Sequence, residues 1–154
     1  AIQRDAPLIA ANAPRRYVTL ARTEGFEAIE NLDETRRGLV ALPDPPLEGP
    51  YRDRFMDHDH AVDLPDEVME GYFRAQQIWD ATMAGSVVDS LDAGRRPVLL
   101  LVGRFHSDHG GGTVELIRRG APDAEVLVIS LEPEADPADP IDPAQADIVI
   151  FTAP

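Results

Sequence analysis

Apolar residues recur at helical spacing over most of the chain and form short continuous runs near its end. The longest helical pattern covers residues 65–93, where steps of three and four connect Val68, Tyr72, Ala75, Trp79, Met83, Val87 and Leu91. Pro65 suits the first turn of this helix, and Gly94 is typical of a residue that follows a helix. The pattern predicts one long amphipathic helix in the middle of the chain.

Shorter helical patterns lie on both sides of this segment. Residues 15–24 follow Pro14 and precede Gly25, which predicts a helix with a defined start and end. Weaker patterns predict further short helices at residues 26–32, 51–60 and 113–119. Residues 36–42 fit no pattern clearly, and proline and glycine make residues 43–50 a loop.

Continuous apolar runs predict the strands. Residues 98–102 form one such run, which we interpret as a strand buried on both faces, and similar runs cover residues 125–131 and 147–151. Strand, helix and strand in this order predict parallel pairing, so the fold class is α/β, a mostly parallel sheet flanked by helices in a single domain over residues 1–154. An acidic, proline-rich loop spans residues 132–146.

A further apolar run begins almost at the first residue. Residues 7–13 are typical of a strand from the middle of a sheet, with little sequence before them. We therefore expect an incomplete domain that lacks its N-terminal strand or strands, and the missing half of the domain is an expected partner.

Composition narrows the chemistry. The formal net charge of −14 disfavours nucleic acid and anionic membranes as partners. All 14 basic residues are arginine, which excludes lysine Schiff-base chemistry and a Walker phosphate loop. The absence of cysteine excludes thiol nucleophiles, iron–sulfur clusters and cysteine-ligated zinc. Residues 1–5 show no signal-peptide pattern.

The best candidate site is the loop after the strand at residues 98–102. Gly103 ends the apolar run, and His106, Asp108 and His109 follow before three consecutive glycines that end at Gly112. The carboxyl ends of parallel strands are where open α/β sheets place ligands. Two imidazoles three residues apart can both reach one metal ion or one haem edge, although a polar turn gives the same pattern.

Two other sets of residues allow a functional and a structural interpretation. Asp80 lies beside the apolar stripe of the long helix and shares a face with Gln76 and Met83, so it is either a flank acid in solvent or a site residue. His58 and His60 alternate with aspartates, and a solvated charged segment explains them better than a ligand pair.

Three short segments resemble the ChaN-like family of haem-binding uptake proteins, within the Tiki and erythromycin-esterase-like superfamily. Residues 75–84, AQQIWDATMA, look like the signature helix of that family, and residues 100–106, LLVGRFH, with Gly112 beyond, resemble its final Gly-x-x-His loop. Residues 11–16, ANAPRR, which include Asn12, resemble its earlier strand-to-helix junction. The three segments occur in the family's order and cover most of residues 7–131.

The resemblance implies the C-terminal part of a ChaN-like α/β domain that binds haem or a related small molecule. The cofactor-binding residues it implies are Gly103, His106, Asp80, Met83, Gly112 and Asn12. It also implies a role in haem-iron uptake or handling in the bacterial envelope or periplasm, and it allows a homodimer. The family's tyrosine ligand cannot be assigned by motif to any tyrosine of this chain.

Two alternatives remain open at this point. Other branches of the superfamily are metal-dependent hydrolases that use two Gly-x-x-His motifs, and this chain has one, Gly103 to His106. In that case a divalent metal ion, held by His106 and His109, would take the place of haem. The other alternative is a structural module with a vestigial site.

Overall fold

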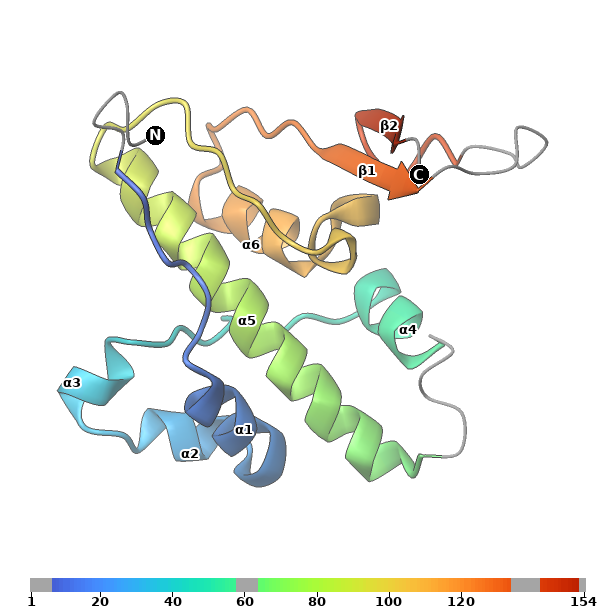
Figure 1. Cartoon of the computed structure of the whole chain (residues 1–154). Helices are drawn as coiled ribbons and strands as arrows, with labels where there is room; N and C mark the ends of the chain where they lie inside the picture. The colour runs from blue at the N-terminus through green and yellow to red at the C-terminus, as the bar shows by residue number, and fades with distance from the viewer. Residues whose placement is uncertain (1–6, 58–63, 134–141, 153–154) are drawn as a thin grey trace.

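A long central helix, α5, organises the fold. The computed structural model describes residues 7–57, 64–133 and 142–152. Helix α5 spans Asp66–Asp92, close to the predicted 65–93, and its first turn carries Asp66 and Glu67, which favour the positive end of the helix dipole. Figure 1 shows α5 running diagonally through the molecule between two groups of elements.

One group is helical and packs against the first half of α5. Helix α1 (Arg15–Glu24) and helix α2 (Phe26–Glu30) confirm the predicted helices, and α3 (Glu34–Arg37) adds one turn. Helix α4 (Pro50–Met56) lies nearby on another side of α5 (Figure 1). The core between α1, α2 and α5 contains Tyr17, Val18, Ala21, Ile29, Ala75 and Ile78.

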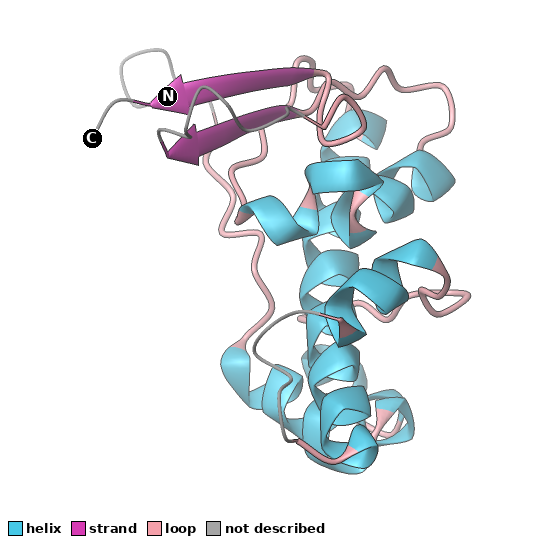
Figure 2. Cartoon of the chain, turned by 90° about the vertical axis from the view of Figure 1, so that its right-hand side faces the viewer, coloured by secondary structure: helices cyan, strands magenta, loops and turns pink. Residues whose placement is uncertain are grey.

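The other group carries the sheet. Two turns of 3-10 helix, η3 (Arg104–His106) and η4 (Asp108–Gly110), precede helix α6 (Gly112–Gly120), which packs on α5. Strands β1 (Ile129–Pro133) and β2 (Ile148–Thr152) pair in parallel, with Ile129 opposite Ile148 and Pro133 opposite Thr152. The fold is therefore α/β with a small parallel sheet at one end of the helical part (Figure 2).

Three predictions about strands were wrong within the described residues. Residues 98–102 are extended but join no sheet, and they are not buried on both faces, because Leu99 is 83% exposed and Leu101 is 85% exposed. Residues 7–13 also form no strand ladder, and β1 begins at Ile129, four residues later than expected. Each error concerns pairing between distant segments, which an apolar run does not determine.

Two predictions concern segments that lie largely outside the described residues. The acidic loop predicted at residues 132–146 begins too early, because Glu132 and Pro133 belong to β1, and its residues 134–141 lie outside the described residues. His58 and His60 also lie outside them, in residues 58–63. Among the described residues, no helix is long and apolar enough to cross a membrane.

Candidate functional site

A buried carboxylate, that of Asp80, lies at the centre of the candidate site. Asp80 is in the middle of α5 and is completely buried. Its Oδ2 accepts a hydrogen bond of 2.6 Å from the Tyr51 hydroxyl, and its Oδ1 accepts one of 2.6 Å from the Thr113 hydroxyl. The Nδ1 atom of His106 lies 2.7 Å from the same Oδ1. Buried carboxylates are costly unless they are hydrogen-bonded in this way. Asp80 is therefore the acceptor of a buried hydrogen-bond cluster and not a flank acid in solvent.

Three separate elements bring these partners to α5. Tyr51 is in the first turn of α4, Thr113 is in the first turn of α6, and His106 ends η3. Gln76 lies one turn before Asp80 on α5, and its Nε2 is 2.9 Å from the Tyr51 hydroxyl. The arrangement therefore depends on how α4, η3 and α6 pack on α5.

Close packing at Gly112 fixes the position of α6 over Asp80. A Cβ atom added to Gly112 would lie 2.5 Å from Asp80 Oδ2 and 2.5 Å from Tyr51 Cε1. Gly111 is equally crowded, since a Cβ there would lie 2.7 Å from the Phe105 carbonyl oxygen. These two glycines allow backbone to approach side chains and carbonyl groups, rather than forming a loose turn.

The protonation states within this cluster follow from its contacts. Burial, reinforced by the neighbouring Asp80 carboxylate, raises the pKa of the Tyr51 phenol far above its ordinary value. Tyr51 therefore stays a protonated donor to Asp80. An ionised carboxylate only accepts hydrogen bonds, so we assign the proton of the His106 imidazole to Nδ1. The Gln76 amide, 3.1 Å from that Nδ1, then donates to the Tyr51 oxygen instead.

His106 is the point where the buried cluster meets a cavity. Its side chain is 19% exposed, and it lines a cavity of about 1000 Å³ on the α4 side of α5. With Nδ1 directed to Asp80, Nε2 is the ring nitrogen left for a ligand. A carboxylate behind a histidine in this way fixes its tautomer and makes it a stronger metal ligand.

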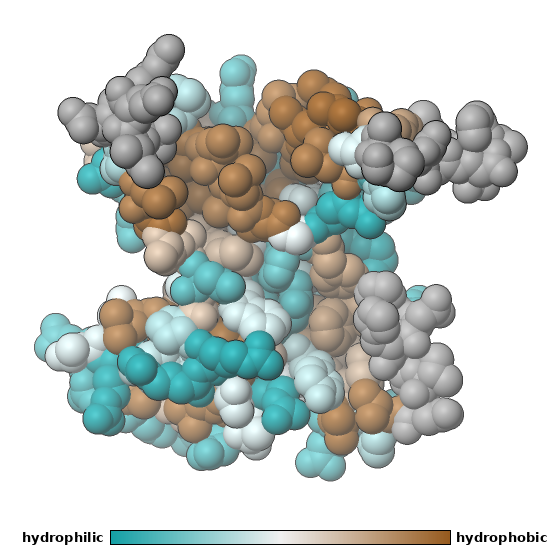
Figure 3. All heavy atoms as spheres, viewed as in Figure 1, coloured by the Kyte–Doolittle hydropathy of each residue, from teal (hydrophilic) through white to brown (hydrophobic). Residues whose placement is uncertain are grey.

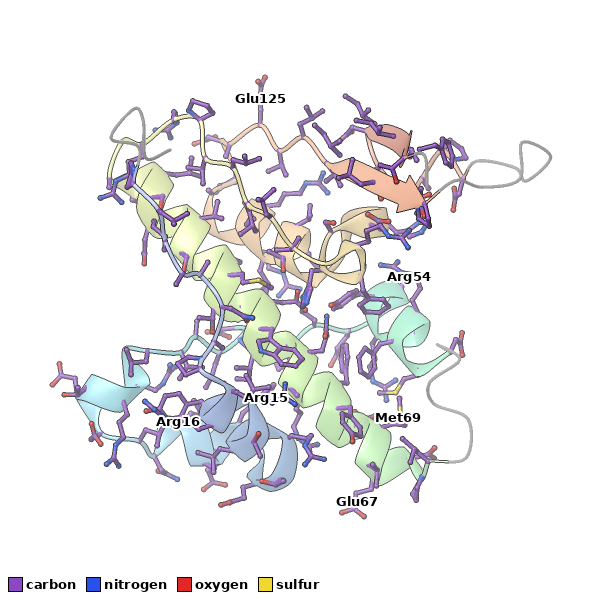
Figure 4. The ribbon with its side chains drawn as sticks, in the orientation of Figure 1. Arg15, Arg16, Arg54, Glu67, Met69 and Glu125 are labelled. Carbon is purple, nitrogen blue, oxygen red and sulfur yellow. The ribbon has the colours of Figure 1, made fainter. Side chains whose placement is uncertain are left out.

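The cavity combines apolar walls with a polar lining that carries charges of both signs. Its apolar and aromatic lining consists of Phe55, Leu64, Met69, Tyr72 and Phe105, and its polar lining consists of Arg54, Asp57, Gln76, Arg104, His106, Asp108 and His109. Figure 4 shows Arg54 on α4 and Met69 on α5 along the same side of the molecule. Phe55 and Phe105 pack edge to face, with ring centroids 5.8 Å apart. Apolar and aromatic walls with a few polar and charged groups are typical of a small-molecule site.

A second polar cluster borders the cavity around Asp108. Asp108 is 8% exposed, and its Oδ2 accepts hydrogen bonds from Ser130 Oγ (2.9 Å) and Gln145 Nε2 (3.0 Å). Its Oδ1 is buried and has no hydrogen-bond partner among the described residues. The Asp108 carboxylate thus connects η4 to β1 and does not orient the ring of His106, as Asp80 does.

His109 differs from His106 in its surroundings. It adopts a left-handed backbone conformation with φ of 57°, and its amide donates to the Gln145 carbonyl at 2.7 Å. Its Nδ1 lies 3.6 Å from Asp142 Oδ2, so the two histidines have different carboxylate partners. Among the described residues, no group of three or more His, Cys, Asp or Glu side chains is arranged to hold a metal ion.

The structure brings together four of the six residues implied as cofactor-binding. Gly103 and His106 line the cavity, and Asp80 and Gly112 lie directly behind His106. Met83 is buried on α5, and Asn12 is exposed just before α1. Neither Met83 nor Asn12 lines the cavity.

Sequence reasoning missed Tyr51 and most of the cavity wall. Tyr51 lies 29 residues from Asp80 in the chain, and no motif connects the two. Tyr51 and Phe55 of α4 lie one helical turn apart and Phe105 lies in η3, but no local pattern connects these two segments to each other. The local signs of this cluster are the spacing of Gln76 and Asp80 on the long helix and the loop from Gly103 to His106.

Comparison with known proteins identifies the family of the chain. A family model described as haem-binding uptake, Tiki superfamily, ChaN matches residues 1–117. The chain belongs to this family. The ChaN match includes α1 to α5 and most of α6, and therefore contains all members of the Asp80 cluster, whereas β1 and β2 lie beyond it. Searches of the curated proteins and of the solved structures find no significant match.

Proposed function

We propose that this protein binds haem in the cavity beside α4, with Nε2 of His106 as the iron ligand. The observation that carries the proposal is the Asp80–His106 pair on the wall of a largely apolar cavity. Histidine is a common protein ligand of haem iron, and a carboxylate on its other nitrogen strengthens it. Membership of a haem-binding uptake family supports the same ligand.

The remaining residues of the cavity fit haem in size and chemistry. Ligand cavities range from about 300 to 1000 Å³, and this one is at the upper end of that range. The aromatic side chains of Phe55, Tyr72 and Phe105 offer stacking surfaces for a porphyrin. Arg54 and Arg104 offer guanidinium groups for its carboxylates, although Arg104 also pairs with Glu132.

Tyr72 is the tyrosine of the chain that is placed to replace His106 as the ligand. It lines the cavity and is 43% exposed. Tyr51 is held by Asp80 with its pKa raised, which opposes the phenolate form that binds iron. We assign the ligand to His106, and Tyr72 serves as its competitor in the test.

Haemin titration tests the proposal. The wild-type protein should give a shifted Soret band at one equivalent, and His106→Ala should weaken binding by about 10-fold or more. His109→Ala is the matched control, because it removes a second cavity-lining imidazole that has no contact with Asp80, and it should bind nearly as the wild type does.

Three results would contradict the proposal. Absence of a spectral shift in the folded wild-type protein would remove haem binding and leave a structural module. Loss of the band in Tyr72→Phe with retention in His106→Ala would reassign the ligand. Equal losses in His106→Ala and His109→Ala would show that the Asp80–His106 pair has no special role. Circular dichroism of each variant separates these results from unfolding.

A biological role in haem-iron uptake or handling in the bacterial envelope extends this proposal. Fractionation of the native cell and growth on haem as the sole iron source would test it. Metal-dependent hydrolysis receives no support from the described residues, since no ligand group for a divalent ion is found among them.

A further inference from the structure

Residues 97–102 and 124–128 are two extended segments outside the sheet. Together with β1 and β2 they leave an apolar face open above α5 and α6. Residues 98–102 alternate: Val98 and Leu100 pack against the core of α5 and α6, whereas Leu99 and Leu101 are almost fully exposed. Exposed apolar side chains continue across the neighbouring segments at Leu127, Ile129, Leu131, Ile148 and Ile150. Figure 3 shows these hydrophobic residues as a broad patch over the upper part of the molecule. Soluble proteins rarely expose so large an apolar surface without a partner.

A cavity separates the two extended segments within this face. It has a volume of about 910 Å³, residues 97–102 and 124–129 form its sides, and Val87, Val114 and Ile117 contribute to its floor. Within the described residues, no backbone hydrogen bond involves residues 97–102 or 125–127. Both sides of the cavity therefore present unpaired backbone groups, which proteins seldom leave unsatisfied.

The shape and direction of this cavity suit one additional strand. Residues 97–102 lead into η3 and residues 124–128 lead into β1, and the two segments run in the same direction (Figure 1). Residues 126–131 already alternate in exposure as a strand does, with Val128 and Ser130 buried and Leu127 and Ile129 exposed. A strand placed between the two segments would pair with both edges and lie over the apolar floor.

We propose that the cavity is the binding site of one parallel β-strand from polypeptide outside the 154 residues. The strand would be mainly apolar and uncharged, because the cavity floor and the surrounding face are apolar. The inference does not depend on haem binding. It would make residues 98–102 an inner strand, the environment that their unbroken apolar sequence favours.

The chain itself offers no suitable occupant. The segments outside the described residues are 1–6, 58–63, 134–141 and 153–154, and the three long enough to form a strand all contain charged residues. Residues 134–141 also contain two prolines, which cannot donate to a strand ladder. A second copy fits less well, because each copy carries a formal charge of −14 and two stacked faces would not pair the backbone within the cavity.

The added strand would also end at the candidate site. A parallel strand in this position has its carboxyl end beside η3 and η4, next to His106 and Asp108. The Oδ1 atom of Asp108 is buried there without a partner among the described residues. Residues that follow the strand are thus placed to donate to this oxygen and to complete the rim of the cavity that His106 lines.

Amide hydrogen exchange tests the proposal directly. The 154-residue chain is compared with two longer proteins expressed from the same gene. One adds the residues encoded before Ala1, and the other adds the residues encoded after Pro154. Amides of residues 98–102 and 125–128 should exchange rapidly in the short chain and at least about 10-fold more slowly in one extended protein. The amides of β1 and β2 that already pair with each other serve as the internal control.

Each other result overturns the proposal. Slow exchange of these amides in the monomeric short chain would show that the cavity closes without a partner. Protection that appears only as the short chain dimerises, measured by sedimentation, would assign the face to a second copy. Rapid exchange in both extended proteins, with β1 and β2 protected, would show that no such strand is supplied by the protein.

Discussion

Replacement of Gly112 by alanine tests the packing of α6 on Asp80. The new Cβ would lie 2.5 Å from both Asp80 Oδ2 and Tyr51 Cε1, so the carboxylate or the phenol ring must move. Overpacking of this kind costs about 1–3 kcal/mol. Loss of the 2.6 Å hydrogen bond between Tyr51 and Asp80 adds about 1.5–3 kcal/mol, because the acceptor is charged.

The two contributions overlap, since movement that relieves the clash is also movement that breaks the bond. The gain in helix propensity from glycine to alanine offsets up to about 1 kcal/mol. We therefore expect Gly112→Ala to lower the free energy of unfolding by about 2–4 kcal/mol. For a chain of this size, that corresponds to a fall in Tm of about 5–15 °C.

The assay is urea denaturation followed by circular dichroism, with Gly85→Ala as the matched control. Gly85 is in the interior of α5, and a Cβ there would meet only Ala41 Cβ at 3.9 Å, an ordinary contact. That variant should be more stable than the wild type by about 0.5–1 kcal/mol. If Gly112→Ala were as stable as Gly85→Ala, the close approach of α6 to Asp80 would be refuted.

Three further substitutions probe the charges of the site. Asp80→Asn should destabilise the protein by about 2–4 kcal/mol in urea denaturation and weaken haemin binding, because an amide cannot accept from Tyr51, Thr113 and His106 together; unchanged stability would contradict this role. Asp108→Asn should change stability by less than about 1 kcal/mol, since Oδ1 makes no hydrogen bond among the described residues and Oδ2 keeps its two donors; a loss as large as that of Asp80→Asn would oppose this. Tyr51→Phe should reduce the loss of stability that the protein shows at alkaline pH. Folding raises the pKa of the Tyr51 phenol, so the stabilisation that this phenol contributes is complete below about pH 10. Above that pH it falls by up to about 1.4 kcal/mol per pH unit. Denaturation at pH 8 and at pH 11 measures this difference, and equal losses in the wild type and Tyr51→Phe would refute it.

Local sequence patterns predicted the helices well because helix formation depends on neighbours three and four residues apart. The stripe from Val68 to Leu91 specified α5 almost to the residue, and Pro14 and Gly25 bounded α1 correctly. The apolar run at residues 98–102 predicted an extended segment correctly. It did not reveal that this segment lacks strand partners among the described residues, since pairing depends on sequence elsewhere.

The residues of the candidate site also differ in how far local sequence predicts them. His106 and Gly103 were predicted because a histidine after a strand and a glycine forms a local pattern. Asp80 was singled out as an acid beside an apolar stripe, but its burial and its pairing with His106 required the tertiary structure. Tyr51 could not be predicted, because its partner is set by how α4 docks on α5.

The buried carboxylate of Asp80 also has a consequence for how the chain selects its packing. If α6 slid along α5 by one helical turn, about 5.4 Å, apolar residues such as Ile117 would still find apolar neighbours. Thr113 and Gly112, however, would leave Asp80, and an ionised group would remain buried with fewer donors. Apolar contacts alone tolerate several alignments of the two helices, whereas this carboxylate accepts one, so it distinguishes the native alignment from its near neighbours during folding.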